Sequence, residues 1–346
     1  MTTYKIKTLI NDVRMSTQEL LQLINTKIEE GVNEFEIEAC GQHNIGGGNK
    51  RSINKPLIFH VTNPGQRVGA MGMEGTKIVV EGSAPADIGW LNSGAKIVVK
   101  GDAGDTAAHC AAGGKIYVSG RVGTRSGALM KHDPKFEQPE FWVLKNTGSF
   151  SFEFMGGGIA VICGYDSEDL PSVLGNRSCV GMVGGTVYVR GKIDGIAECV
   201  EIKKLDKYDK DFLKSGMSDF LKEIEKKELL EELLDFSQWV KLVPLPQKAK
   251  IERITLAEFK QKEWFPNGLF GDLVEDNGDL YNLAQTGNAR LRKPEWNKDL
   301  CIGCNLCVNN CPQKAISDSY TVKEDRCIGC GICSAVCPKK AWKMLK

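Results

Sequence analysis

Five eight-residue segments of the chain share one pattern of apolar positions, and each begins and ends with glycine. In every segment the third and fifth residues after the first glycine are small or apolar, and this period of two predicts a strand with one buried face. The first three segments begin 19 residues apart, which places one strand in each 19-residue unit. Such a repeat predicts a parallel β-helix whose coils stack about 4.8 Å apart and turn at glycines. The segments are GTKIVVEG (75–82), GAKIVVKG (94–101), GGKIYVSG (113–120), GGIAVICG (157–164) and GGTVYVRG (184–191).

The residue between those two buried positions is also apolar or aromatic in all five segments, although it should face outward. Solvated sheet faces normally carry polar residues at such positions. This outward row therefore predicts that something covers the face, either the chain's own helices or another subunit. Its members are Val79, Val98, Tyr117, Val161 and Tyr188.

The segments between the predicted strands also repeat, with the same spacing of 19 residues. Leu91, Cys110 and Leu129 lie nine residues after the closing glycine of three successive segments, so we expect them to form a buried row. Adjacent residues of an extended chain face opposite sides, so His109 and Cys110 should not form a reactive pair. The other cysteines outside 301–337 show no CxxC spacing, and we interpret them, like Cys110, as inert buried thiols: Cys40, Cys163, Cys179 and Cys199.

Helical and strand patterns flank the glycine-rich repeats. Ser16 and Glu19 form a capping box at the start of a helix over 16–30, which Gly31 ends, and NEFEIEA (33–39) predicts a strand that caps the solenoid. Apolar residues return at three- and four-residue spacing between 220 and 240. The charged run KEIEKKELLEELLD (222–235) indicates the solvated face of that helix.

Charge and length exclude several classes of function. The 346 residues include 45 basic and 44 acidic side chains, so no surplus of positive charge favours nucleic acid or an anionic membrane. No apolar run approaches the ~20 residues needed to cross a bilayer, and the first residues lack the apolar stretch of a signal peptide. We therefore expect a cytoplasmic protein of two or three domains, with no nucleic-acid and no membrane partner.

Cysteine is concentrated in one part of the chain, because eight of the 13 cysteines lie between residues 301 and 337. CIGCNLCVNNCP and CIGCGICSAVCP each spell CxxCxxCxxxCP, the spacing of bacterial two-cluster ferredoxins. The first three thiolates of a run can surround one corner of a cubane, whereas the fourth points away and ligates the other cluster. Two zinc sites are the alternative, but they would use CxxC pairs at wider spacing. We therefore assign Cys301, Cys304, Cys307 and Cys337 to a first [4Fe-4S] cluster, and Cys327, Cys330, Cys333 and Cys311 to a second.

The segment 296–346 thus resembles the ferredoxin family, and the resemblance implies one-electron transfer through the two clusters. Its charge departs from that family, whose free members are usually acidic. Residues 295–346 include eight basic and five acidic side chains. A positive surface suits docking of an acidic partner such as a soluble ferredoxin, or permanent burial in a complex, and a chance solvated surface is the alternative.

A second resemblance covers about residues 16–245. Several runs, together with WVKLVPLP (239–246), look like the GXGXG domain of glutamate synthase, the β-helical module at the end of its large subunit. Formylmethanofuran dehydrogenases use a similar GXGXG subunit beside a molybdenum or tungsten site. His43 and the long connection LPSVLGNRS (170–178) depart from the family pattern, so no contact is carried over to them. The runs are GQHNIGGG (41–48), GAMGMEGTKIVVEG (69–82), GRVGTRSGALMKH (120–132), FEFMGGGIAVICG (152–164) and CVGMVGGTVYVRG (179–191).

The resemblance to glutamate synthase implies that catalysis lies on other chains. Thr2 stands where the glutaminase would have its N-terminal cysteine nucleophile, and no FMN-binding barrel pattern is found. No GxGxxG follows a strand and opens a helix either. We therefore expect no catalytic residue and no cofactor beyond the two clusters here, with FMN or FAD on partner subunits. The expected partners are an FMN-containing synthase subunit, a glutaminase subunit and an NAD(P)H- or ferredoxin-oxidising subunit.

Together these patterns predict a mainly β protein, with a right-handed parallel β-helix, a helical segment and a small α+β ferredoxin-like domain. We expect the solenoid with its N-terminal helix over 1–206, the helical segment that closes it over 207–245, a linker or docking strap over 246–295 and the two-cluster domain over 296–346. The expected function is a scaffold and electron-transfer subunit of a glutamate synthase-like oxidoreductase. The alternatives are a subunit of a formylmethanofuran dehydrogenase-like or other redox complex, and a free electron carrier with a solenoid attached.

Overall fold

The computed structural model describes residues 3–48, 56–246, 293–323, 327 and 329–345. The chain divides into two compact units, Met1–Lys248 and Ala249–Lys346. The predicted connection over 246–295 lies largely outside the described residues. Within the described part of the chain, no helix has the length and apolar composition needed to cross a membrane.

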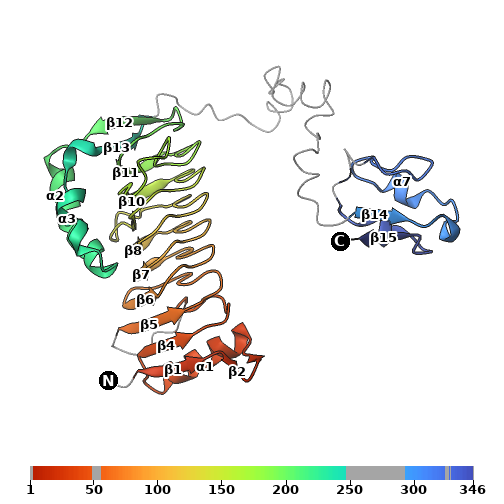
Figure 1. Cartoon of the computed structure of the whole chain (residues 1–346), viewed down its shortest axis with the longest axis horizontal. Coiled ribbons are helices and arrows are strands. Elements are labelled where there is room, and N and C mark those ends of the chain that lie inside the picture. Colours follow the sequence, from red (N-terminus) through yellow and green to blue (C-terminus); the bar gives the residue numbers. More distant parts are fainter. Residues whose placement is uncertain (1–2, 49–55, 247–292, 324–326, 328, 346) are drawn as a thin grey trace. The chain divides into compact units, whose positions relative to one another are not determined.

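The first unit is built on one 11-stranded sheet, in which each coil of the chain adds a neighbouring strand (Figure 1). Pairing is parallel from β1 to β11, and β11 then pairs antiparallel with β13, which pairs antiparallel with β12. The five glycine-bounded segments form β6, β7, β8, β10 and β11, so the predicted parallel β-solenoid is confirmed. In order across the sheet the strands are β1 (Tyr4–Lys7), β4 (Glu34–Glu38), β5 (Leu57–Thr62), β6 (Thr76–Val80), β7 (Ser93–Val99), β8 (Gly113–Val118), β9 (Glu140–Val143), β10 (Gly156–Ile162), β11 (Gly184–Arg190), β13 (Trp239–Pro244) and β12 (Val200–Lys204).

One side of these strands fills the interior of the solenoid. The register places Ile78 beside Ile97 and Ile97 beside Ile116 on successive coils, and all three side chains are buried. Burying one such side chain is worth roughly 1.5–3 kcal/mol relative to leaving it exposed. The period-two alternation of the sequence therefore becomes a stacked apolar core that runs through the coils.

The helix α1 (Thr17–Glu29) begins as its sequence predicts. The Glu19 N–H donates to the Ser16 hydroxyl at 3.2 Å, and the Ser16 N–H donates to the Glu19 carboxylate at 2.7 Å. Its buried side chains join the solenoid core beside β1 and β4, so α1 covers the interior at this end of the stack (Figure 1). A hairpin of β2 (Leu9–Ile10) and β3 (Val13–Arg14) connects β1 to this helix. The buried side chains of α1 are Leu20, Ile24 and Ile28.

The outward row is covered by the chain itself. The helix α2 (Lys207–Glu223) lies along the sheet, and its Leu213, Met217 and Phe220 share one buried cluster with the row (Figure 1). Each of the five row residues is at most 6 % exposed. The chain's own helix is therefore the cover. Interpreting this row as the seat of a partner subunit is wrong, because the row is not accessible to a partner.

Helix and sheet approach each other closely at Gly216. A Cβ atom at this position would lie 2.4 Å from Cζ2 of Trp142, whose side chain is fully buried. Trp142 belongs to β9, which pairs between β8 and β10 and was not predicted from the sequence. Its ring also lies 5.8 Å from that of Phe212 and 5.6 Å from that of Phe220. An aromatic contact thus joins the middle of the sheet to α2.

Salt bridges also hold α2 on the sheet. The carboxylate of Glu223 lies 2.8 Å from Nζ of Lys77 and 3.2 Å from Nζ of Lys96, and Lys96 also contacts Asp219 at 3.0 Å. The charged run 222–235 is therefore not one solvated helix face, since its first acidic residue docks onto strand lysines and α2 ends there. The chain continues through η1 (Lys227–Leu229), α3 (Leu230–Leu233) and η2 (Phe236–Gln238).

The prediction of a buried row through Cys110 is wrong. Leu91, Cys110 and Leu129 have left-handed φ angles of 54°, 57° and 57°. Leu129 is 43 % exposed, and Leu91 and Cys110 are half-buried. Because these turns are not extended, alternation along the chain does not separate buried from exposed residues as it does in a strand. The buried small residues lie two positions earlier, at Gly89, Ala108 and Gly127.

The second unit is small and contains both strands and helices. β14 (Lys293–Trp296) pairs antiparallel with β15 (Trp342–Leu345), and Trp296 lies opposite Trp342. Strand pairing thus begins within the predicted connection over 246–295. The short helices between the two strands are η4 (Lys298–Leu300), α7 (Leu306–Asn309) and α8 (Ile332–Val336). The buried core of this unit contains Cys307, Ile316, Cys333 and Trp342.

Candidate metal centres

The eight clustered cysteines line two cavities in the second unit. Each cavity receives three cysteines from one run and the fourth cysteine from the other run, which is the grouping assigned from their spacing. Their role as cluster ligands stays a prediction. The first cavity is lined by Cys301, Cys304, Cys307 and Cys337, and the second by Cys311, Cys327, Cys330 and Cys333.

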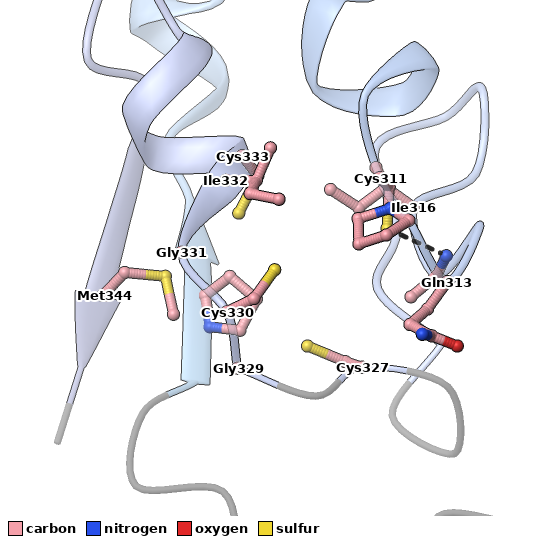
Figure 2. A pocket seen from close by; sticks show the side chains of 13 residues that line it. Cys311, Gln313, Ile316, Cys327, Gly329, Cys330, Gly331, Ile332, Cys333 and Met344 are labelled. Carbon is pink, nitrogen blue, oxygen red and sulfur yellow. Dashed lines mark hydrogen bonds between the residues drawn. The ribbon is translucent and has the colours of Figure 1, made fainter. Parts of the chain in front are cut away.

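Figure 2 shows how the sulfur atoms lie in the second cavity. Cys311 faces Cys327, Cys330 and Cys333 across a common space. Among the residues that the structure describes, no group of three or more His, Cys, Asp or Glu side chains is arranged to hold a single metal ion. A set of four thiols around a shared space fits an iron–sulfur cluster, for which cysteine thiolate is the usual ligand.

Equivalent sharp turns position the third cysteine of each run. Asn305 has a φ of 57° and Gly331 a φ of 80°, and both lie in the left-handed region. The helices α7 and α8 begin directly after these residues, so Cys307 and Cys333 lie in the first helical turn and are buried. The fourth cysteine of each run follows the helix, and this is how the chain delivers it to the cavity of the other run.

Backbone N–H groups reach the fourth cysteine in both halves. The N–H of Ala315 donates to Sγ of Cys311 at 3.2 Å, and the N–H of Ala341 donates to Sγ of Cys337 at 3.2 Å. Each donor lies four residues after its acceptor, so the two halves repeat one local structure. Hydrogen bonds of this kind stabilise negative charge on a thiolate and tune the reduction potential of an attached cluster.

The other walls of the two cavities differ. Tyr320 and Trp342 line the first cavity, whereas Ile316 and Met344 line the second. The Tyr320 hydroxyl donates to Oδ1 of Asn305. Removal from water and the nearby cysteine sulfurs raise the pKa of Tyr320. These walls were not predicted from the sequence. Trp342 and Ile316 each lie five residues after the fourth cysteine of their run. An alignment of the two cysteine runs could therefore have identified both as residues of the cavity walls.

The second, third and fourth cysteines of the two runs match in exposure, whereas the first cysteine is half-buried in one run (Cys301) and buried in the other (Cys327). Cys304 and Cys330, the second cysteine of each run, are exposed. The third cysteines, Cys307 and Cys333, are buried, and burial raises the pKa of Cys333 to about 11. Metal binding would have to release this proton, since thiolate is the ligating form. One side of each cavity thus lies close to the protein surface.

Three cysteines of the first unit, Cys110, Cys163 and Cys179, are in surroundings that suppress reactivity. Cys163 and Cys179 are fully buried, and burial raises the pKa of Cys163 far above its usual range and that of Cys179 to about 12. Burial also raises the pKa of Cys110 and lowers that of His109, opposite to the shifts that create a thiolate–imidazolium pair. The expectation of buried thiols fails for the three that are only partly buried, Cys40, Cys110 and Cys199.

Two curated relatives each resemble part of the chain. An uncharacterized protein of Methanocaldococcus jannaschii is 34% identical over 133 residues, which are 37% of this chain and 50% of the relative. The pyruvate synthase subunit PorD of Pyrococcus furiosus is 40% identical over 71 residues, which are 20% of this chain and 61% of the relative. The chain therefore spans only about half to three fifths of the length of these relatives.

Family comparison matches both units of the chain. Residues 51–245 match the family described as the GXGXG motif, and this match covers more than half of the 346 residues. Residues 294–317 and 320–343 each match the 4Fe-4S binding domain, and each range includes one of the two cysteine runs. The chain belongs to the GXGXG family and is an iron–sulfur protein with two 4Fe-4S binding motifs.

Proposed function

We propose that the chain is the scaffold and electron-transfer subunit of a multi-subunit glutamate synthase-like oxidoreductase. In this role it passes electrons through two [4Fe-4S] clusters to FMN or FAD on a partner subunit. The observation that carries the proposal is the pair of four-cysteine cavities in a chain of the GXGXG family. The similarity to PorD, named as a subunit of pyruvate synthase, supports a place within a multi-subunit enzyme.

The residues of the second unit would act by binding and shielding. Cys301, Cys304, Cys307 and Cys337 would hold the first cluster, and Cys311, Cys327, Cys330 and Cys333 the second. Bound clusters would supply reversible one-electron chemistry. The N–H groups of Ala315 and Ala341 would stabilise the charge on the two shared thiolates. Trp342 and Ile316, both buried, would exclude water from the inner walls.

The first unit would act as a rigid support. Its core is a continuous stack of buried side chains, and α2 covers the outward row of β6, β7, β8, β10 and β11. Its fully buried cysteines have raised pKa values, which argues against nucleophilic chemistry there. We therefore assign the chemistry to partners: an FMN-containing synthase subunit, a glutaminase subunit and an NAD(P)H- or ferredoxin-oxidising subunit. The cytoplasm is the expected location.

The decisive experiment is purification of the complex from the native cell through a tag on this chain. Co-purification of a flavin-containing chain and a glutaminase chain would support the proposal. A partner that contains molybdopterin would contradict it and favour the formylmethanofuran dehydrogenase-like alternative. Recovery of the chain without partners would favour a free electron carrier.

Iron analysis tests the cofactor independently of the partners. Two [4Fe-4S] clusters correspond to about eight iron atoms per chain. A stoichiometric zinc content without iron would contradict the proposed electron transfer. The loaded chain should also be bleached by a chemical reductant and recover its colour on reoxidation.

A further inference from the structure

Exposed apolar side chains gather beside the first cavity. Leu300 is 48 % exposed, Ile302 is 59 % exposed and Leu306 is 42 % exposed. Ile302 and Leu306 line the cavity itself, and the exposed Cys304 lies between them in sequence. Large apolar side chains with such exposure need an explanation when they lie together, because they favour association with another surface.

Lysines flank this apolar group. Lys298, Lys339 and Lys340 are exposed, and they lie within three residues of Cys301 or Cys337. The Asn297 N–H donates to the Ala341 carbonyl at 2.8 Å. This hydrogen bond joins the segment that contains Lys298 to the segment that contains the other two lysines. Asp299 is the one acidic side chain in the two segments 297–301 and 337–341, so the local charge is positive.

One apolar position that both cavities share in the described residues differs in exposure between them. Ile332 occupies the position that Leu306 has in the other run, but it is only partly exposed. The two halves repeat in their cysteines and in their N–H to sulfur hydrogen bonds, but they differ in exposure at this position.

We propose that the surface formed by Lys298, Leu300, Ile302, Leu306, Lys339 and Lys340, which we call the first-cavity rim, is the docking site for an acidic electron-transfer protein. An apolar centre with a charged edge is the usual composition of a protein interface. Positive charge at the edge would steer a partner whose own redox centre is surrounded by Asp and Glu. The inference rests on the proposed electron-transfer function and adds where electrons would be exchanged: at the first cavity, through the exposed side of Cys304.

The test compares two double variants with equal changes in charge. Lys298→Glu with Lys340→Glu alters the first-cavity rim. The matched control is Lys314→Glu with Lys323→Glu. Lys314 corresponds to Lys340 in the other run, since each lies three residues after the fourth cysteine, and their φ angles are 48° and 53°. All four lysines are exposed.

The measurement is the second-order rate of electron exchange between the iron-loaded full chain and a purified acidic ferredoxin, by stopped-flow absorbance at several salt concentrations. We expect the rim variant to react about tenfold more slowly at low salt and to lose most of its salt dependence, since steering of this kind changes association rates by about 10- to 1000-fold. The control should stay within about twofold of the unchanged chain. Ile302→Asn should weaken the complex without altering the salt dependence, which tests the apolar centre separately.

Two results of this test would overturn the inference. Equal slowing of both double variants would overturn the inference, because total charge rather than the rim would then control the rate. Unchanged rates in the rim variant would overturn it as well. Lys298→Gln with Lys340→Gln repeats the test with a milder change if the first variant binds less iron. Failure of the unchanged chain to bind about eight iron atoms would instead contradict the proposed function itself.

Discussion

The hydroxyl of Tyr117 donates a hydrogen bond to the carboxylate of Asp219 at 2.8 Å, across the contact between β8 and α2. Lys96 binds the same carboxylate oxygen at 3.0 Å, and the Tyr117 side chain is fully buried. A residue of the outward row thus holds the helix that covers the row. If this contact were lost, α2 would no longer cover the apolar outward row. The first three predictions test the strength of the contact.

Tyr117→Phe should lower the free energy of unfolding of the first unit by about 1.5–3 kcal/mol, the range for a hydrogen bond to a charged group. The variant keeps the ring in place but leaves Asp219 without one donor. Urea unfolding followed by circular dichroism would measure the loss. Tyr208→Phe is the matched control, because Tyr208 is 85 % exposed and should be neutral. A loss as small as that of the control would mean that Lys96 alone satisfies the carboxylate.

Acid should weaken the attachment of α2. Desolvation acts to raise the pKa of Asp219 and of Glu223, but hydrogen bonds from Tyr117 and the lysines outweigh it, and both pKa values lie below their ordinary values of 3.8 and 4.5. A carboxyl whose folded-state pKa is lowered stabilises the fold above its unfolded pKa, and this contribution is lost as pH falls through the folded-state value. We therefore expect stability to fall as pH drops below about 4.5.

The variant Lys96→Met tests this pH dependence. It should cost on the order of 1 kcal/mol at neutral pH, because Lys96 pairs with two partly exposed carboxylates. Its difference from the unchanged chain should shrink as pH falls through the lowered folded-state pKa values of the two carboxylates, where they become protonated. Lys5→Met is the control, since the Lys5–Glu36 pair is largely exposed and should contribute little. A difference that is independent of pH would contradict the assignment to these ion pairs.

Gly216→Val should destabilise the first unit by about 1–3 kcal/mol through overpacking. Its Cβ atom would come within 2.4 Å of the buried Trp142 ring, so the ring or the helix would have to shift. Ser215→Val is the matched control, because it lies on the exposed side of α2 and should cost only a few tenths of a kcal/mol in helix propensity. Equal effects of both substitutions would mean that α2 does not pack as closely as described.

The pairing of cysteines between the two runs can be tested by iron content. Cys304→Ala with Cys337→Ala removes two ligands of the proposed first cluster, so about four iron atoms per chain should remain. Cys304→Ala with Cys311→Ala removes one ligand from each cluster, and iron should fall well below four. Cys110→Ala should leave iron unchanged. If each run instead held its own cluster, the second pair of substitutions would leave about four iron atoms and the first pair would leave few.

Much of the solenoid could be predicted because the same pattern of glycines and alternating apolar residues occurs in several repeats. Glycine at both ends and alternation between them recur in the segments that form β6, β7, β8, β10 and β11. β9 (Glu140–Val143) was missed because Phe141, Trp142 and Val143 are continuous apolar residues without bounding glycines. β1 was missed because Tyr4–Lys7 has only one buried position, Ile6.

What covers the outward row could not be decided from the sequence. The spacing of apolar residues shows that α2 has an apolar face. It does not show that this face packs on the sheet of the same chain. The salt bridge from Lys77 to Glu223 links residues 146 positions apart, and such a contact depends on the tertiary course of the chain. The grouping of the cysteines was easier to predict from the sequence, because the ligand spacing within each run already restricts which sulfurs can lie around one space.

The edge strands at the two ends of the stack determine whether molecules can associate through their sheets at high concentration. A sheet that grows by adding parallel strands could in principle continue from one molecule to the next at an open edge. At one edge, β1 presents Lys5 and Lys7, each paired with a glutamate of β4. At the other edge, the strand direction reverses at β13, and β12 ends with the exposed Lys203 and Lys204. The charged side chains at both edges disfavour addition of a further coil, so we expect the solenoid to keep a defined length.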